Sequence, residues 1–220
     1  MKKIIFASAL LSSLLLSAQF SFDTTRYGVT GGATYSRITN AHNPSGPLYS
    51  FYGGFLALIP INDSEQFFLQ PEVEYLGAGE SGRDSDAKGY PGYDAIYANH
   101  YISIPIYFKA YFSEAESEFF GVAGPKFNIL LGQTIKDAPL KYTVDGDPAT
   151  GVNGKAASFN FALGFGLGYS YKRKLEVTAR YDLGLSNTYK GLMSELAKDP
   201  NTQKSKSEQV LSVGLSYIFD

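Results

Sequence analysis

Histidine and cysteine, two of the commonest residues in general-base and nucleophilic catalysis, are scarce in this sequence. The chain of 220 residues has two histidines, His42 and His100, and no cysteine. Ser81 and three aspartates precede His100, so a histidine–carboxylate pair near Ser81 is the one catalytic arrangement to consider. The three aspartates are Asp84, Asp86 and Asp94. Histidines in polar stretches are mostly solvated and no spacing here selects a triad, so we predict that the protein is not an enzyme.

Two acid-rich motifs are similar to fragments of calcium-binding loops. They are the Asp-Ser-Asp of Asp84–Asp86 and the Val-Asp-Gly-Asp-Pro of Val144–Pro148. Neither motif has the full run of oxygen ligands that a calcium site requires. Aspartate and glycine are also the usual residues of hydrophilic turns. The sequence therefore predicts turns at these positions, with no metal and no cofactor.

Seven charged residues follow a different pattern, because each lies on the polar side of a segment in which apolar and polar residues alternate. They are Glu72, Glu74, Lys109, Lys126, Glu176, Arg180 and Asp182. If these segments are strands of one barrel, all seven side chains point into its interior. Buried charges persist when they are paired and hydrogen-bonded, so we predict a salt-bridge network in the lumen. An eight-stranded interior is filled by its own side chains, which favours a closed lumen over a narrow pore.

The segments that carry these charges show long period-two alternation. In Ser158–Gly168 large apolar residues alternate with small ones, and Leu175–Ser186 repeats the pattern with charges on the second face. Runs of this length match transmembrane strands, which need about 9–11 residues. Six further strands are predicted at Tyr27–Ser36, Ser50–Ile59, Phe67–Leu76, Tyr101–Phe112, Phe119–Leu130 and Gln209–Phe219. Ser50–Ile59 is apolar on both sides, so its facing stays open.

The connections between these strands alternate between short and long. Short connections are expected at Asn62–Gln66, Ser113–Glu118 and Tyr171–Lys174, and the longest ones at Gly77–His100, Gly132–Lys155 and Asn187–Glu208. Strict alternation places all tight turns at one end and all long loops at the other, as in outer-membrane barrels. We therefore predict an all-β fold, an eight-stranded antiparallel up-and-down transmembrane β-barrel. In the last long loop, Gly191–Lys198 has the apolar spacing of a short helix that would cap the mouth.

Three prolines lie inside the predicted strands. Pro71, Pro105 and Pro125 each remove a hydrogen-bond donor from the ladder, and a closed barrel has no edge strand to hold them. We expect β-bulges or strand ends at these positions.

A soluble barrel with eight strands is the structural alternative. The chain is rich in aromatic residues, with 17 Tyr and 16 Phe. In Ser158–Gly168 the face opposite the large residues carries only Gly, Ala, Ser and Asn, which suits a crowded interior, whereas bulky outward residues suit lipid. Aromatic belts are expected from Tyr27, Phe67, Phe112, Phe119, Tyr169, Tyr217 and Phe219 at the periplasmic interface, and from Tyr35, Tyr75, Phe159 and Tyr181 at the other. We predict outer-membrane lipid as the surroundings.

The N-terminus has the features of a secretory signal peptide. Lys2 and Lys3 precede an apolar stretch, and Leu16-Ser17-Ala18 provides a small-residue cleavage site before Gln19. The stretch is short for a membrane anchor. We predict a signal peptide at residues 1–18 and a barrel domain at residues 19–220. Without the two leader lysines, 17 of the 19 basic residues remain against 21 acidic ones, a net charge of −4 that does not favour nucleic acid as a partner.

The last predicted strand matches the assembly signal of outer-membrane proteins, polar-x-Gly-x-x-aromatic-x-aromatic. The matching residues are Ser212, Gly214, Tyr217 and Phe219. Such a strand would be recognised through edge pairing by the barrel-assembly machinery of a Gram-negative bacterium. The same strand must pair with Tyr27–Ser36, because an open edge does not persist in hydrocarbon.

Taken in order, several short segments resemble the PorT-like family of small outer-membrane β-barrels. The segments are Tyr27–Gly32, Gln70–Glu72, Tyr101–Pro105 followed by Lys109, Ala123–Pro125, Arg180–Leu185 and the C-terminal strand. The resemblance implies that the strand prolines are a family feature. This chain has Ser103 where family proteins often have a carboxylate or amide, which puts any role of that group in doubt. The resemblance implies a fold and no reaction.

Three classes of function remain open from the sequence. The first is a structural or surface-recognition barrel that acts through its long extracellular loops. The second is a narrow pore for small solutes. The third is an accessory subunit of an envelope or secretion complex, as the family resemblance suggests.

Overall fold

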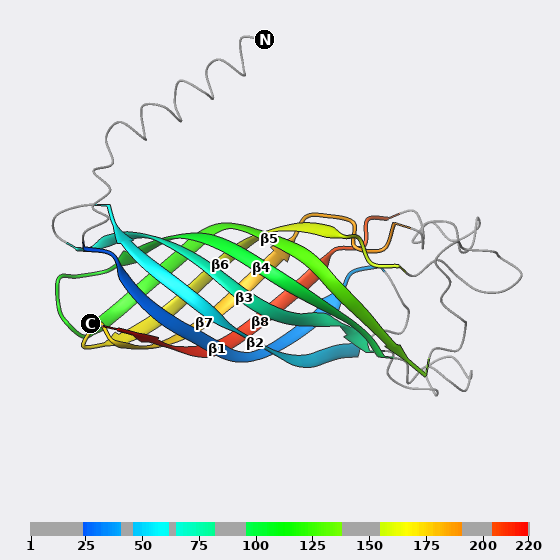
Figure 1. Cartoon of the computed structure of the whole chain (residues 1–220), viewed down its shortest axis with the longest axis horizontal. Helices are drawn as coiled ribbons and strands as arrows, with labels where there is room; N and C mark the ends of the chain where they lie inside the picture. Colours follow the sequence, from blue (N-terminus) through cyan, green and yellow to red (C-terminus); the bar gives the residue numbers. More distant parts are fainter. Residues whose placement is uncertain are drawn as a thin grey trace, which may run out of the picture.

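The computed structural model describes residues 24–40, 46–61, 65–81, 96–137, 155–190 and 204–219. These residues form one closed barrel in which every strand pairs antiparallel with its neighbours in chain order (Figure 1). The strands are β1 Arg26–Ile38, β2 Gly46–Pro60, β3 Phe67–Ser81, β4 Ile96–Tyr111, β5 Glu118–Lys136, β6 Phe159–Tyr171, β7 Leu175–Gly184 and β8 Glu208–Ile218. The predicted fold and the predicted order of strands are confirmed. None of the described segments forms a helix long and apolar enough to span a membrane.

The barrel closes between its first and last strands. β1 and β8 pair continuously from Gly28 opposite Ile218 to Ile38 opposite Glu208. At the middle of this seam Gly32 lies opposite Gly214, so two backbones meet there without side chains between them. The pairing predicted for the last strand is confirmed, and it leaves no open edge in the wall.

The two ends of the barrel differ in their connections and in how far the strands extend. The short turns and the C-terminus lie together at one end, and β4 and β5 extend farthest at the other end (Figure 1). β4 and β5 remain paired out to Ile96 opposite Lys136, whereas β6 follows β5 as far as Phe159 opposite Ile129. Because β3 also stays paired with β4 out to Ser81 opposite Ile96, the wall formed by β3, β4 and β5 continues beyond β6 among the described residues.

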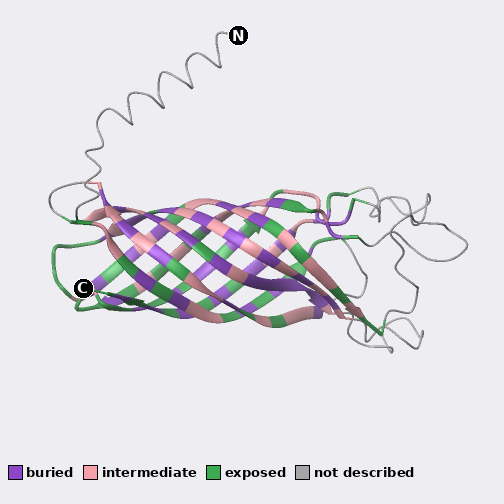
Figure 2. Cartoon of the chain, viewed as in Figure 1, coloured by how far each residue is buried: buried purple, intermediate pink, exposed green. Residues whose placement is uncertain are grey.

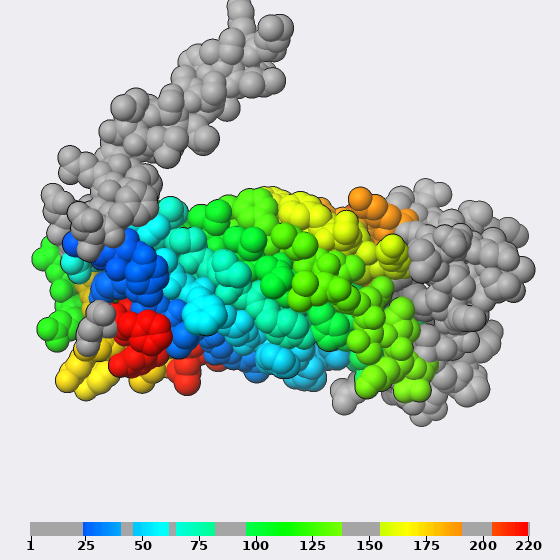
Figure 3. All heavy atoms as spheres, viewed as in Figure 1, coloured from blue at the N-terminus to red at the C-terminus, as the bar shows by residue number. Residues whose placement is uncertain are grey.

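Burial alternates along each strand, as period-two sequences require (Figure 2). β8 shows this most simply, with Leu211, Val213 and Leu215 outward and exposed, and Ser212 and Ser216 inward and buried. The predicted facing of this strand is confirmed. On the face in view, side chains of β1 to β5 cover the wall without a gap between strands (Figure 3).

β2, whose facing the sequence leaves open, points its aromatic residues both ways. Tyr52, Leu56 and Leu58 are buried inside the barrel, while Phe51 and Phe55 are exposed on the outer surface. Apolar residues on both faces are therefore divided between the lumen and the lipid.

The lumen contains large aromatic side chains in addition to small ones. Phe68, Tyr101, Tyr107, Tyr111 and Phe120 are all fully buried inside the barrel. Small residues line the interior on β6, as predicted for Ser158–Gly168, whereas β3, β4 and β5 contribute these rings.

The physical reason is complementarity across the lumen, because the glycines of β6 leave room for rings from the other strands. A Cβ on Gly164 would lie 2.8 Å from the ring of Tyr107, and one on Gly168 would overlap the ring of Phe120.

The three strand prolines lie in mid-strand, so the expectation of bulges or strand ends is wrong. Each one interrupts the ladder towards the preceding strand for two residue pairs, and the register is the same on both sides of the interruption. Towards the following strand, Pro71, Pro105 and Pro125 remain paired with Ile106, Lys126 and Leu163. A proline lacks one donor but keeps its carbonyl, so the ladder loses local bonds without an inserted residue. Irregular register occurs instead between Pro47 and Tyr52 and between His100 and Tyr101.

Candidate functional site

The interior of the barrel holds two groups of ion pairs, which together we call the lumen network. Arg180 on β7 reaches across the lumen to β3, where its Nη1 lies 2.8 Å from Glu72 Oε2 and 3.8 Å from Glu74 Oε2. Its Nη2 donates to Thr30 Oγ1 at 3.2 Å and to Tyr52 Oη at 3.4 Å. The guanidinium therefore connects β7 with β1, β2 and β3.

A second bridge runs through Lys126 on β5. Its Nζ lies 2.8 Å from Asp182 Oδ2 on β7 and 2.9 Å from Glu74 Oε1 on β3. Glu74 is thus shared between Lys126 and Arg180. Gln70 supports the same group of carboxylates, because its Nε2 donates to Glu72 Oε1 at 2.6 Å.

Nearer the short-turn end, Lys109 and Glu176 form a separate pair. Lys109 Nζ lies 2.6 Å from Glu176 Oε1 and 2.5 Å from Oε2, and both side chains are almost wholly inaccessible to solvent. Tyr111 Oη donates to the same carboxylate at 2.7 Å. The ammonium also lies 4.1 Å from the centre of the Phe120 ring, a distance at which a cation–π contact stabilises it.

At the long-loop end the polar groups are mainly uncharged. Glu208 Oε2 accepts hydrogen bonds from Asn99 Nδ2 at 3.2 Å and from Tyr101 Oη at 3.3 Å. Tyr189, which follows β7, lies 3.2 Å from Asn99 Nδ2. Burial raises the pKa of Tyr189 well above its usual value, so this phenol stays protonated in alkaline solution as well. Glu208 is not among the predicted lumen residues, because the predicted last strand begins one residue later, at Gln209.

One arginine connects the turns at the opposite end. Arg173, in the β6–β7 turn, donates to the carbonyls of Glu65, Ser113 and Ala115 and pairs with Glu118 Oε1 at 2.5 Å. These acceptors belong to the β2–β3 connection, the β4–β5 connection and the start of β5. Its guanidinium also lies 4.1 Å from the centre of the Tyr111 ring, so it covers the bottom of the lumen.

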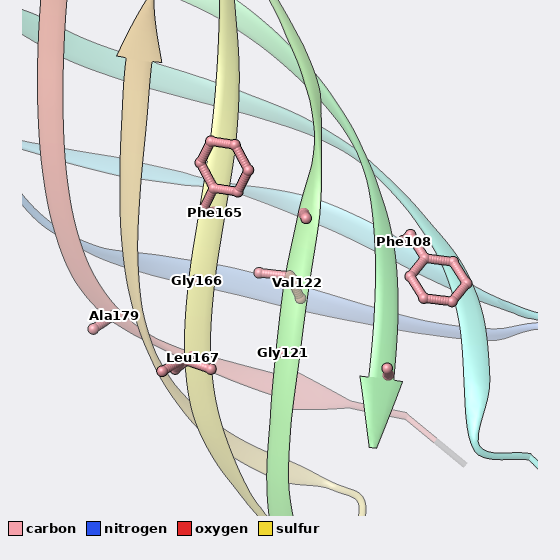
Figure 4. Close-up of a pocket in the computed structure, with 9 residues that line it drawn as sticks. Phe108, Gly121, Val122, Phe165, Gly166, Leu167 and Ala179 are labelled. Atoms are coloured by element: carbon pink, nitrogen blue, oxygen red, sulfur yellow. The ribbon is translucent and has the colours of Figure 1, made fainter. Parts of the chain in front are cut away.

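The outer wall has a shallow groove over β4 to β7, with a volume of about 580 Å³. Its floor is made of small residues, among them Gly121, Gly166 and Ala179, and the side chains of Phe108, Phe165 and Leu167 border it (Figure 4). The groove is apolar and carries no group that could act on a substrate.

The structure brings the seven predicted lumen residues together in the two parts of the lumen network. Lys109 and Glu176 form one part, and the other five residues form the second. Of the predicted assembly signal, Ser212 and Gly214 face the lumen, while Tyr217 and Phe219 lie on the outer surface with ring centres 5.9 Å apart.

Of the candidate catalytic residues the structure describes only His100 and Ser81, and these two side chains are not hydrogen-bonded to each other. His100 lies on β4, with Nδ1 2.7 Å from Tyr75 Oη and Nε2 3.1 Å from Thr134 Oγ1. Ser81 Oγ donates to the carbonyl of Pro47. The signal peptide, His42, both Asp-rich motifs, Asp94 and the predicted helix at Gly191–Lys198 lie outside the described residues. Within the described ranges, no group of three or more His, Cys, Asp or Glu side chains could hold a metal ion.

Comparison with known proteins identifies the class to which this barrel belongs. The family model for the outer membrane protein beta-barrel domain matches residues 17–190. The chain therefore belongs to this family of β-barrel proteins of the Gram-negative outer membrane. No curated protein matches the sequence.

Several solved structures are similar to this barrel at low sequence identity. Ail, the attachment invasion locus protein of Yersinia pestis, is 10% identical with a TM-score of 0.44, over 88% of this chain and 98% of that chain. Neisserial surface protein A is 14% identical with a TM-score of 0.45, over 88% and 97%. OprG from Pseudomonas aeruginosa is 10% identical with a TM-score of 0.46, over 92% and 98%.

Proposed function

We propose that this protein is a closed outer-membrane barrel that acts in surface recognition through its long extracellular loops. The observation that carries the proposal is the lumen network, in which Arg180 and Lys126 hold β3, β5 and β7 together across the interior. Buried aromatic rings fill the space on both sides of these ion pairs. A lumen filled in this way supports no solute path, and it provides a rigid base for the loops.

Single-channel recording in planar bilayers tests the closed lumen. We expect the wild-type barrel to show no openings above background under conditions in which a general porin conducts. The double variant Arg180→Ala/Glu72→Ala removes the ion pair that joins β7 to β3 across the lumen. We expect this variant to show channel openings of small conductance. Regular openings of the wild-type barrel would refute the closed lumen and favour the narrow pore.

Replacement of the loops tests recognition. In three variants, residues 83–94, 139–153 or 192–202 are exchanged for a short Gly-Ser linker. We expect each variant to keep the heat-modifiable gel migration of the folded barrel. Binding of wild-type barrels in lipid nanodiscs is measured on an array of surface glycans and extracellular matrix proteins. At least one loop variant should lose a binding signal that the wild-type barrel shows. Unchanged binding in all three variants would contradict a role for the loops.

We also propose the route by which the chain reaches the membrane. Residues 1–18 are proposed to be a cleaved signal peptide, and Ser212, Gly214, Tyr217 and Phe219 to be read by the barrel-assembly machinery. The outward position of Tyr217 and Phe219 supports the second part, because both rings are accessible on the wall. Mass spectrometry of the exported protein should find Gln19 as the first residue. Replacement of both aromatic residues by alanine should reduce the amount of assembled barrel.

A second candidate function is that of an accessory subunit in an envelope secretion complex. The PorT-like segments around Pro71, Pro105 and Pro125 favour it, and these three prolines occupy consecutive strands with the same local pairing. Chemical cross-linking in intact cells followed by purification in detergent tests this candidate. A stoichiometric envelope partner would support it, and a barrel purified without one would contradict it.

A further inference from the structure

The carboxylate of Glu208 differs in its partners from the carboxylates of the lumen network. Only neutral donors, Asn99 and Tyr101, hydrogen-bond to it, and both bind the same oxygen, Oε2. Among the described residues no lysine or arginine nitrogen lies within 4.0 Å of Glu208, although its side chain is buried with 5% exposure. A buried carboxylate that stays ionised without a countercharge is unfavourable, so either a proton or a positive ion must neutralise it.

Four oxygens without hydrogen-bond partners belong to residues that line one small cavity beside Glu208. They are Glu208 Oε1, Asp182 Oδ1, Asn160 Oδ1 and Thr188 Oγ1. All four residues are at least nine-tenths buried. The polar groups around the cavity are connected, because Asn160 Nδ2 donates to Tyr101 Oη, which in turn donates to Glu208 Oε2. The residues come from β6, β7, β8 and the segment after β7.

The size of the cavity limits what it can hold. Its free volume is about 10 Å³, which is the space of one water molecule or one small ion. Three of the four oxygens are acceptors without a hydrogen, and the hydroxyl of Thr188 supplies the single donor. The cavity therefore has a surplus of lone pairs, which is the environment that a hard cation prefers.

Charge decides between a monovalent and a divalent cation. Asp182 is already paired through Oδ2 with Lys126 at 2.8 Å, so Glu208 contributes the one negative charge that lacks a partner. Ca²⁺ would require six to eight oxygens and would lie close to the Lys126 ammonium. We propose that this cavity binds one alkali cation the size of Na⁺, coordinated by Glu208, Asp182, Asn160 and Thr188. The cation supplies the missing charge and fixes β6, β7 and β8 below the long loops.

Cation-dependent thermal unfolding of the purified, refolded mature chain in zwitterionic detergent tests the proposal. Tm is measured at pH 8 while NaCl replaces choline chloride at constant ionic strength, so that charge screening is unchanged. Because a ligand that binds only the folded state stabilises it, Tm should rise by at least about 2 °C and then saturate. KCl is expected to give a smaller rise. A rise with CaCl₂ and none with NaCl would overturn the assignment to a monovalent ion.

Two variants identify the site, with a matched control. Glu208→Gln removes the unpaired charge and should abolish the dependence of Tm on Na⁺, while Glu116→Gln, an exposed carboxylate in the β4–β5 turn, should keep it. Thr188→Val removes one ligand without a change of charge, so the NaCl midpoint should rise several-fold. This second variant keeps the proposal testable if Glu208→Gln does not fold.

Two results would overturn the proposal: a wild-type Tm that is the same in NaCl and choline chloride, or an unchanged Na⁺ dependence in both cavity variants. The first result would mean that a water molecule or a proton occupies the cavity. Neither result bears on recognition by the loops or on conductance, which the experiments above measure separately.

Discussion

At the scale of single residues, the Lys109–Glu176 pair shows why breaking a buried ion pair strongly lowers the stability of the fold. Both side chains have lost their water, and Tyr111 adds a hydrogen bond to the same carboxylate. A buried pair of this kind adds little net stability over an apolar pair of the same size. Removal of one partner is different, because it leaves the other charge buried alone.

We therefore expect Glu176→Gln to lower the free energy of unfolding by about 3–5 kcal/mol. Tyr111→Phe should lower it by about 1.5–3 kcal/mol, the range for a hydrogen bond to a charged group. The double variant Lys109→Met/Glu176→Leu should lose much less than Glu176→Gln, which breaks the charge pair. Urea unfolding in lipid vesicles measures all three changes. A Glu176→Gln variant within about 0.5 kcal/mol of wild type would show that the Lys109 ammonium finds another partner.

Arg173 acts through geometry more than through charge. Its planar guanidinium reaches three carbonyls and one carboxylate in the neighbouring turns, an arrangement that an ammonium cannot reproduce. The next residue, Lys172, is exposed in the same turn and provides a control.

Arg173→Ala should lower the free energy of unfolding by about 1.5–3 kcal/mol, since several charge-assisted hydrogen bonds are lost. Arg173→Lys should recover less than half of this loss, and Lys172→Ala should have no measurable effect. Denaturant unfolding measures stability, and protease digestion from the short-turn side reports the opening of the turns. Equal effects of Arg173→Ala and Lys172→Ala would contradict the role of the guanidinium.

At the scale of elements, the seam between β1 and β8 depends on close backbone contact. A Cβ on Gly32 would lie 2.5 Å from the Cα of Gly214 and would overlap the carbonyl of Val213. Gly53 on β2 is different, because among the described residues the only atom within 4 Å of its Cβ position is the carbonyl oxygen of Thr30, at 3.6 Å.

Gly32→Ala is expected to destabilise the barrel by about 1–3 kcal/mol, because β8 must move away. Gly53→Ala should change stability by less than about 0.5 kcal/mol. The temperature at which each variant loses its compact gel migration separates the two, and urea unfolding gives the magnitude. Two variants of equal stability would mean that the seam has more freedom than the structure indicates.

The strands were the most predictable elements, because period-two alternation over about ten residues has no common alternative. The outer ends of β4 and β5 were not predicted. Ile96–His100 contains polar residues typical of a loop, yet Tyr97 and Asn99 point into the lumen while the chain pairs with β5. The prolines misled the prediction for the opposite reason. The rule that proline belongs in edge strands or bulges predicts an irregular register beside each proline. In this barrel each of three neighbouring strand pairs instead loses two residue pairs and keeps its register.

At the scale of the whole molecule, the depth of a residue in the membrane decides the effect of a charge on the outer wall. Phe165 on β6 lies between the aromatic positions Phe159 and Tyr169, whereas Leu131 lies on the part of β5 beyond the last partner of β6. Both side chains are exposed on the outer surface.

Phe165→Arg should lower the free energy of unfolding in lipid vesicles by about 2–4 kcal/mol, and Leu131→Arg by about 0–1 kcal/mol. Phe165→Leu serves as the control for the lost ring. The same variants unfolded in detergent should differ less from each other, because a micelle adapts to the charge. A large effect at Leu131 would move the membrane boundary outward along the β4–β5 hairpin.

The lumen residues were predictable by face but not by partner. Successive side chains of a strand point to opposite faces, so the alternation alone places Lys126, Arg180 and Asp182 inside the barrel. Which carboxylate meets which base depends on strand tilt and on height within the barrel, and neither is written in the alternation. Glu208 was missed because one residue at a strand end carries no periodic signal.

The seam between β1 and β8 also sets the order of events when the barrel forms. It joins residues at opposite ends of the chain, such as Thr30 and Leu215, which are 185 positions apart. The entropy of loop closure rises with chain separation, and pairings between distant segments form slowly. All other seams join strands that follow one another in the sequence, so they form earlier. Until β8 arrives, the sheet has two open edges. A folding chain therefore gains most of its stability in the last step, when β8 pairs with β1. A chain that ends before β8 is unable to close the barrel.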